Sequence, residues 1–104
     1  MPNIEKWAEL ARSFSGFEDA PGLVPGQVDV DQFDDWAADL PSPSSAHVSA
    51  KFVLHLWESH RAWASGKFNL GQAIRTWDDT HLRQFQAWAS DPILWAGHLL
   101  REVS

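Results

Sequence analysis

The most informative segment of the chain combines a helix start with a row of acids, and it reads Val28-Asp-Val-Asp-Gln-Phe-Asp-Asp-Trp-Ala-Ala-Asp-Leu-Pro41. Asp29 as the N-cap with Gln32 three residues later forms a capping-box pattern, and Pro41 ends the helix. Apolar side chains recur at helical spacing at Val30, Phe33, Trp36, Ala37 and Leu40. The segment therefore predicts an amphipathic helix that buries this face.

The acids of this helix are predicted to point away from its apolar face. They recur at i, i+3, i+4 and i+8, as Asp31, Asp34, Asp35 and Asp39. Each pair of like charges at i, i+4 costs an isolated helix about 0.2–0.5 kcal/mol. Two interpretations stay open: a soluble surface that nearby basic side chains compensate, or a docking face for a basic partner.

Proline and glycine divide the rest of the chain into segments that keep the helical period. The breakers between Ser15 and Gln27 predict a loop, and the remaining segments predict helices over 3–16, 45–65 and 70–90 and one from Asp91 on. The helix over 45–65 has the widest apolar arc, so it is expected at the centre. The sequence predicts one all-α domain over 1–104, a compact bundle of about five amphipathic helices with a Pro/Gly-rich loop between the first two.

The helix over 70–90 is predicted to be continuous because its apolar positions keep one register. They are spaced three or four apart, at Leu70, Ile74, Trp77, His81, Phe85 and Trp88. Arg75, Asp79 and Arg83 lie opposite at i, i+4 and i+8, where neighbouring charges attract. Trp77 and Trp88 are expected to be the buried anchors of this helix.

The composition excludes several classes of protein. The 104 residues include 14 acids, 8 bases and no cysteine, for a net charge of −6. The absence of cysteine excludes disulfides and fits a cytoplasmic protein, and no apolar run is long enough to cross a membrane. The negative charge argues against direct binding of nucleic acid, which needs a basic surface.

The negative charge is concentrated in the first part of the chain. Residues 1–40 contain 9 acids and 2 bases, a net −7, whereas residues 41–104 contain 5 acids and 6 bases, a net +1. Glu18 and Asp19 belong to this acidic stretch, which has no cation from Glu18 to Asp39. The asymmetry favours electrostatic attraction of a basic protein partner.

Motifs of nucleophilic catalysis are missing from the sequence, which has no Gly-x-Ser-x-Gly elbow, phosphate-binding glycine loop or Ser-x-x-Lys. His60 and His81 lie on apolar faces of neighbouring predicted helices, and Asp78 is one turn from His81, which permits a metal site. The more ordinary interpretation of His81 is a core histidine hydrogen-bonded to a backbone carbonyl or a carboxylate. We therefore expect no enzymatic activity, no metal and no cofactor.

The tryptophans fall into two groups. Those on apolar faces at helical spacing are expected in the core, namely Trp7, Trp36, Trp57, Trp77 and Trp88. Trp63 and Trp95 lie nearer the edges of their apolar stripes. Each is therefore a candidate for a partly exposed anchor at an interface.

Several motifs resemble those of a known group: Phe-Val-Leu-His-Leu-Trp at 52–57, Phe-Asn-Leu-Gly-Gln-Ala-Ile-Arg-Thr-Trp-Asp-Asp-Thr-His at 68–81, Phe85-x-x-Trp88 and Asp91-Pro92. They resemble segments of small uncharacterised bacterial and mobile-element proteins that are helical and rich in tryptophan. This resemblance covers about 40% of the chain, from Lys51 to Pro92, and implies no activity. In size, acidity and helical character the chain is similar to phage-encoded inhibitors such as anti-CRISPR and anti-restriction proteins.

The leading prediction is a small acidic binding protein that occludes the basic nucleic-acid-binding surface of a partner protein, as a DNA mimic or an antitoxin does. Its partner-binding residues are expected to be acids with a tryptophan anchor: Asp31, Asp34, Asp35, Asp39, Glu18, Asp19, Trp63 and Trp95. The alternative is a helical adaptor or oligomerisation module with a hydrophobic partner. A metal-dependent enzyme using His60, Asp78 and His81 is the third hypothesis.

Overall fold

The computed structural model describes residues 4–42, 44–58 and 60–90 of the chain. These residues form α1 (Ile4–Arg12), α2 (Val30–Ala38), α3 (Ser45–Trp57), α4 (Leu70–Thr76) and α5 (Asp79–Ser90), with no strand among them. The predicted all-α class with about five helices is confirmed for the described residues, although α4 and α5 both lie within the single helix predicted over 70–90. The first residue of the helix predicted over 3–16 and the predicted helix from Asp91, including Trp95, lie outside the described residues.

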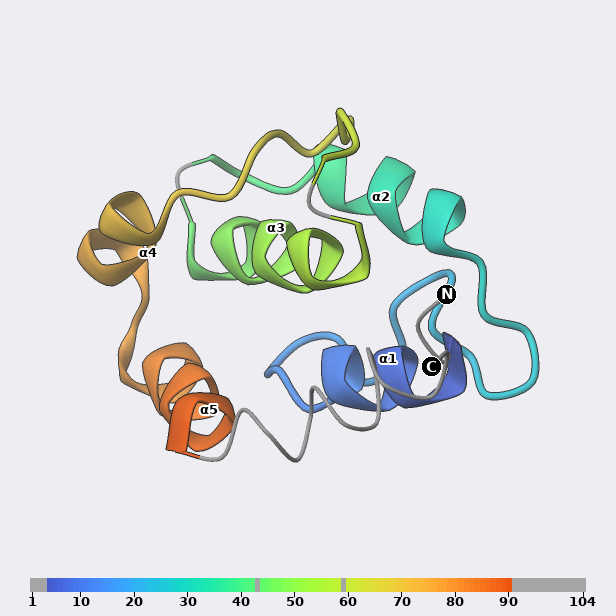
Figure 1. Cartoon of the computed structure of the whole chain (residues 1–104), viewed down its shortest axis with the longest axis horizontal. Helices are drawn as coiled ribbons and strands as arrows, with labels where there is room; N and C mark the ends of the chain where they lie inside the picture. The colour runs from blue at the N-terminus through green and yellow to red at the C-terminus, as the bar shows by residue number, and fades with distance from the viewer. Residues whose placement is uncertain (1–3, 43, 59, 91–104) are drawn as a thin grey trace.

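Helix α3 lies at the centre of the fold (Figure 1). It runs between α1 and α2, and α4 and α5 contact it from another side. The consecutive residues from His47 to Leu54 are all buried, so α3 has no solvent face over about two turns. Even Lys51 is buried, and its Nζ donates to Gln72 Oε1 at 3.0 Å. The prediction of a central third helix is therefore confirmed.

A tryptophan fixes α1 against α3. The indole Nε1 of Trp7 donates to the carbonyl of Val53 at 2.7 Å, and the residue is completely buried. The Trp7 ring also contacts Phe33 of α2 edge-on and Trp57 at the end of α3. Because this indole of α1 touches both α2 and α3, α1 and α2 are held in a defined position relative to α3.

The segment between α1 and α2 consists of consecutive tight turns. The N–H groups of Phe17, Ala20 and Leu23 each donate to the carbonyl three residues earlier, and these three side chains are buried. Gly22, with φ +85°, lies against the start of α2. A β-carbon on Gly22 would collide with the Asp29 carbonyl and lie 2.6 Å from Phe33 N, so this approach requires glycine.

The predicted start of α2, the helix that contains the row of acids, is confirmed. Asp29 is the N-cap with extended backbone, and its Oδ1 accepts from Gln32 N at 3.1 Å. Val30, Phe33 and Ala37 are buried as predicted, whereas Trp36 and Leu40 are half-buried. Helix α2 is thus anchored on one side and free to present polar side chains on the other.

Helix α3 ends eight residues before the predicted boundary at residue 65. The carbonyl of Glu58, which a longer helix would pair with the N–H of residue 62, accepts instead from Trp63 Nε1 at 3.1 Å. Glu58 itself is extended. The prediction of a helix up to residue 65 is wrong because hydrogen bonds outside the helical pattern engage the Glu58 carbonyl and the N–H groups of Ala64 and Ser65.

The predicted continuous helix over 70–90 is also wrong, because the chain breaks at Trp77 and Asp78. Trp77 is extended, with ψ 135°, and Asp78 Oδ1 caps α5 by accepting from His81 N at 2.9 Å. Ser45 joins both sides of the break, since its Oγ accepts from Asp78 N at 2.7 Å and donates to the Thr76 carbonyl. The break turns the Trp77 indole into the core, where Nε1 donates to Ser49 Oγ at 2.7 Å.

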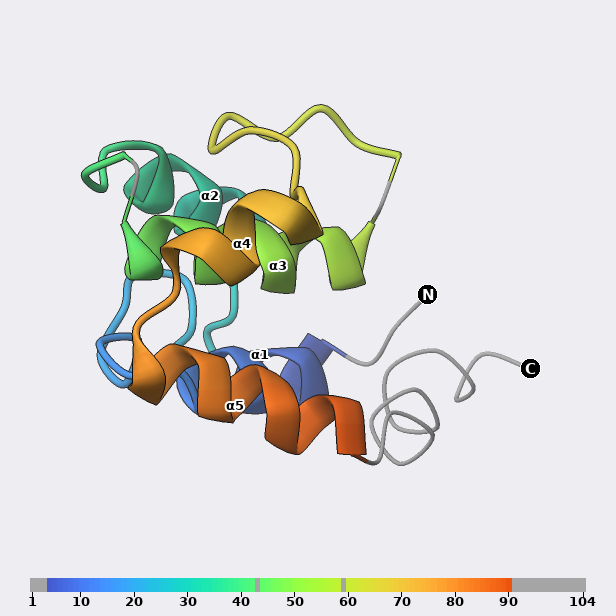
Figure 2. The same cartoon turned by 90° about the vertical axis from the view of Figure 1, so that its left-hand side faces the viewer.

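An aromatic cluster packs between α3 and the α4–α5 pair. Figure 2 shows the arrangement of these three helices. Phe52 of α3 is at the centre of the cluster, with ring contacts at 5.3–6.2 Å to Phe68, Trp77, Phe85 and Trp88. Trp77 is buried, as predicted, but Trp88 is only half-buried.

Among the described residues, no helix has the length and apolar character needed to cross a membrane.

We expect Trp77→Ala to lower the free energy of unfolding by about 3–5 kcal/mol, because it removes a buried indole and leaves a cavity. Trp88→Ala should cost clearly less, since part of that ring is already in water. Chemical denaturation followed by circular dichroism measures both. Equal losses for the two variants would contradict the packing described for this cluster.

Candidate protein-interaction site on helix α2

Asp34, one of the four predicted surface acids, is buried and belongs to the structure of the fold. Its side chain is 6% exposed. Oδ2 accepts from Ala64 N at 2.9 Å, and Oδ1 accepts from Ser65 N at 3.0 Å and from Ser65 Oγ at 2.8 Å. The prediction that all four acids point away from the core is therefore wrong for Asp34, which connects α2 to the segment after α3.

The angular position of Asp34 on the helix indicates its burial. At about 100° per residue, Asp34 lies about 40° from Val30, on the flank of the apolar arc. Asp31, Asp35 and Asp39 lie farther round, and all three are exposed. The signal is small, so the sequence alone did not separate this acid from its neighbours.

Asp31 is exposed but already has a cationic partner. Its Oδ1 forms an ion pair with Arg61 Nη2. The Arg61 guanidinium also lies 4.3 Å from the ring centre of Trp63, in a cation–π contact. Trp63 is only 9% exposed, so its prediction as a partly exposed interface anchor is wrong: α3 ends early, and the indole folds back onto Glu58.

Asp35 and Asp39 are the exposed acids of this row that have no cationic partner among the described residues. Neither side chain forms an ion pair or hydrogen bond with another residue of the described ranges. Trp36 lies next to Asp35 in the chain and is half-buried, with its ring against Phe17 and Phe33. We call Asp35, Trp36 and Asp39 the α2 face.

Two further predicted acids lie in the turns after α1. Glu18 and Asp19 are exposed, and Glu18 Oε2 accepts from the nearby Gly16 N at 2.9 Å. They follow Phe17, whose ring packs on Trp36 at 5.8 Å. The structure therefore keeps these two acids outside α2 but in the same N-terminal half of the fold.

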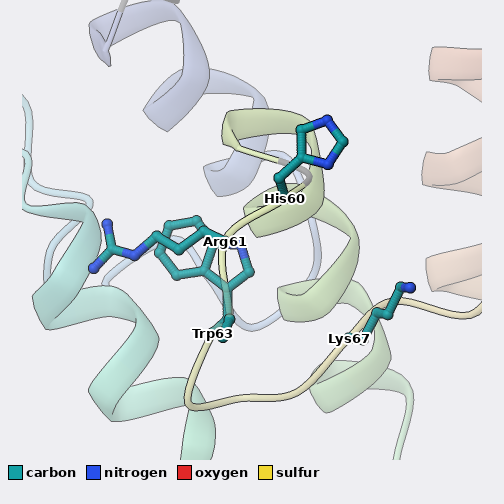
Figure 3. A pocket seen from close by; sticks show the side chains of 5 residues that line it. His60, Arg61, Trp63 and Lys67 are labelled. Atoms are coloured by element: carbon teal, nitrogen blue, oxygen red, sulfur yellow. The ribbon is translucent and has the colours of Figure 1, made fainter.

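The described surface has a hollow of about 410 Å³, lined by His60, Arg61, Ala62, Trp63 and Lys67 (Figure 3). Figure 3 shows His60, Arg61 and Lys67 extending in three different directions. Arg61 is already paired with Asp31. The three basic side chains thus do not converge on a point at which they could hold an anion together.

The histidines of the metal hypothesis lie in different environments. His81 is buried, with Nδ1 2.8 Å from Asp78 Oδ1 and Nε2 3.0 Å from the Ser15 carbonyl. This confirms a core histidine hydrogen-bonded to a carboxylate and a carbonyl. His60 is exposed after α3, and no group of three or more His, Asp or Glu side chains suited to a metal occurs in residues 4–42, 44–58 and 60–90.

A serine, a histidine and an aspartate do meet, but not in the geometry of a catalytic triad. His47 Nε2 donates to the carbonyl of Ser65 at 2.8 Å, not to its hydroxyl. The Ser65 hydroxyl contacts Asp34, and Ser65 is 5% exposed. A nucleophile needs an adjacent base and access for a substrate, so this network connects α2, α3 and residues 64–65 without forming such a site.

Comparisons with known proteins add no neighbour to this description. The chain matches no protein-family model, no curated protein and no solved structure.

Asp34 and Asp35 are neighbours in α2 but differ in burial, so replacing each of them tests the hydrogen bonds of Asp34. We expect Asp34→Asn to lower the free energy of unfolding by about 2–4 kcal/mol, because the amide NH₂ would face a backbone N–H and leave buried donors unpaired. Asp35→Asn should stay within about 0.5 kcal/mol of the original chain. Equal effects in chemical denaturation would show that the Asp34 hydrogen bonds are not formed.

A pH dependence follows from the cap of α5. The hydrogen bond from His81 N, followed by that from the His81 side chain, lowers the pKa of Asp78 below its ordinary value of 3.8. A lowered pKa means that the ionised form favours the folded chain, so this contribution is present above the ordinary pKa and lost as pH falls through the folded pKa. Asp78→Asn should therefore be less stable than the original chain at pH 7, and the difference should close as pH falls through the lowered pKa of Asp78. Denaturation midpoints across this range measure it, and a difference independent of pH would contradict it.

Proposed function

We propose that this protein is a small non-enzymatic binding protein that docks on a basic surface of a partner protein. The observation that supports the proposal best is the α2 face, where Asp35 and Asp39 stand exposed with no cation beside them in the described structure. A basic partner would supply the missing positive charge, as complementary surfaces do in other complexes.

The position of Asp35 and Asp39 makes their charge costly to the free protein. They are four residues apart on one helix, where like charges repel by about 0.2–0.5 kcal/mol. Asp39 is the C-cap of α2, and a negative charge at a helix C-terminus is also unfavourable. No contact of either side chain within the described structure offsets these costs, because both side chains are in water.

The α2 face is smaller than the row of four acids in the sequence. Asp34 is buried and Asp31 is paired with Arg61, so Asp35 and Asp39 are left to make direct contacts. Glu18 and Asp19 add to the long-range field that attracts a basic protein. Trp36 replaces Trp63 as the proposed anchor, because its half-buried ring is held by Phe17 and Phe33 while part of it faces solvent.

The partner class we propose is a nucleic-acid-binding protein whose basic surface the α2 face covers, in the manner of anti-CRISPR, anti-restriction or antitoxin inhibitors. Such a partner already carries a surface that binds negative charge. Binding of this protein and of nucleic acid would then be mutually exclusive.

The test is capture of host proteins on the immobilised chain, followed by elution with a short DNA duplex. We expect a basic protein that the duplex releases, and we expect Asp35→Asn with Asp39→Asn to slow its association and reduce its salt dependence. Glu58→Gln with Asp79→Asn is the matched control, because it also removes two exposed carboxylates but leaves α2 unchanged. Capture that neither the duplex nor the α2 double variant weakens would contradict the proposal.

A further inference from the structure

The outward side of α4 carries exposed apolar side chains. Ile74 is 56% exposed and Leu70 is 47% exposed, the highest values among the large apolar residues of the described chain. Gly71 and Arg75 are exposed beside them. We call Leu70, Gly71, Ile74 and Arg75 the α4 face.

The rotation of α4 that exposes this face is fixed by its opposite side. Ala73 is completely buried, and Gln72 Oε1 accepts from the buried Lys51 Nζ at 3.0 Å. Trp77, the residue after the last residue of α4, anchors the end of the helix through the hydrogen bond from its indole to Ser49 Oγ. Leu70 and Ile74 therefore cannot turn inward without breaking these contacts.

The charge of the protein makes the α4 face the place where two copies can approach each other. The chain carries a net −6, and its acids are concentrated in residues 1–40. Residues 69–90, in contrast, contain two arginines and two aspartates, Arg75, Arg83, Asp78 and Asp79, and are neutral. Figure 1 shows α4 and α5 on the side of the molecule away from α2, so two copies that meet through α4 keep their acidic halves apart.

We propose that the α4 face is a self-association surface on which a second copy of this chain packs through its own α4 face. In such a two-fold contact, the Leu70 and Ile74 side chains of both copies leave water together. Gly71 helps the two helices approach, because it has no side chain in the middle of the face. This inference does not rest on the proposed function, since it uses a different helix from the α2 face.

The experiment is sedimentation equilibrium on the full chain, its Ile74→Glu variant and its Val24→Glu variant. The average mass of the original chain is expected to rise from one copy toward two between about 10 and 500 µM, as for a contact below the standard interface size. Ile74→Glu should remain a single copy because it places a charge in the contact. Val24→Glu is the matched control, since Val24 is 46% exposed in the turns before α2, and it should associate like the original chain.

Salt separates this association from docking through α2. Raising NaCl from about 50 to 300 mM screens the repulsion between two chains of net −6 and should strengthen self-association, whereas it should weaken binding of a basic partner. A single copy at every concentration and salt level would overturn the proposal, as would equal association of the two variants. If the original chain is monomeric and Ile74→Glu melts at a lower temperature, another segment of the same chain covers the face, which also overturns it.

Discussion

The carboxylate of Asp34 is the constraint on which the arrangement of α2, α3 and the segment between α3 and α4 depends. A buried carboxylate is strongly unfavourable unless donors surround it, and here the two consecutive N–H groups of Ala64 and Ser65 and the Ser65 hydroxyl supply them. These bonds place residues 64–65 on α2, and His47 of α3 then donates to the carbonyl of Ser65. The same segment carries Trp63 and Arg61, so the cation–π contact and the Asp31 ion pair also depend on it.

The acids of α2 differ in their surroundings. The buried acid stabilises the fold, Asp31 is neutralised by Arg61, and Asp35 and Asp39 are left for a partner. The proposed docking face is therefore short, and long-range attraction from the acidic N-terminal half becomes more important than a row of regularly spaced charges. The α4 face is largely apolar and contains no acid, and it lies away from the α2 face, so the two proposed surfaces differ in chemistry as well as in position.

Local patterns in the sequence predicted the helices whose ends are set by local signals. The cap of α2 by Asp29 and the central position of α3 are examples, because capping residues and apolar period act within a few positions. The end of α3 and the break between α4 and α5 were not predicted, since Asp34, Ser45 and Ser49 act on residues about 30 positions away in the chain. Asp78, three residues before His81, was the local signal for the break, and the unbroken apolar register hid it. The spacing of three between Phe14, Phe17, Ala20 and Leu23 likewise signalled the buried turns after α1.

Amide hydrogen exchange at Ala64 and Ser65, measured by NMR on the original chain, tests whether the Asp34 carboxylate holds this segment on α2. Ala64 is exposed and outside any helix, so its N–H would exchange rapidly if the Asp34 carboxylate did not hold it. We expect both amides to be protected to within about tenfold of the buried amides of α3, because they open only when residues 64–65 separate from α2. Exchange of both amides at the rate of an unstructured chain would contradict it.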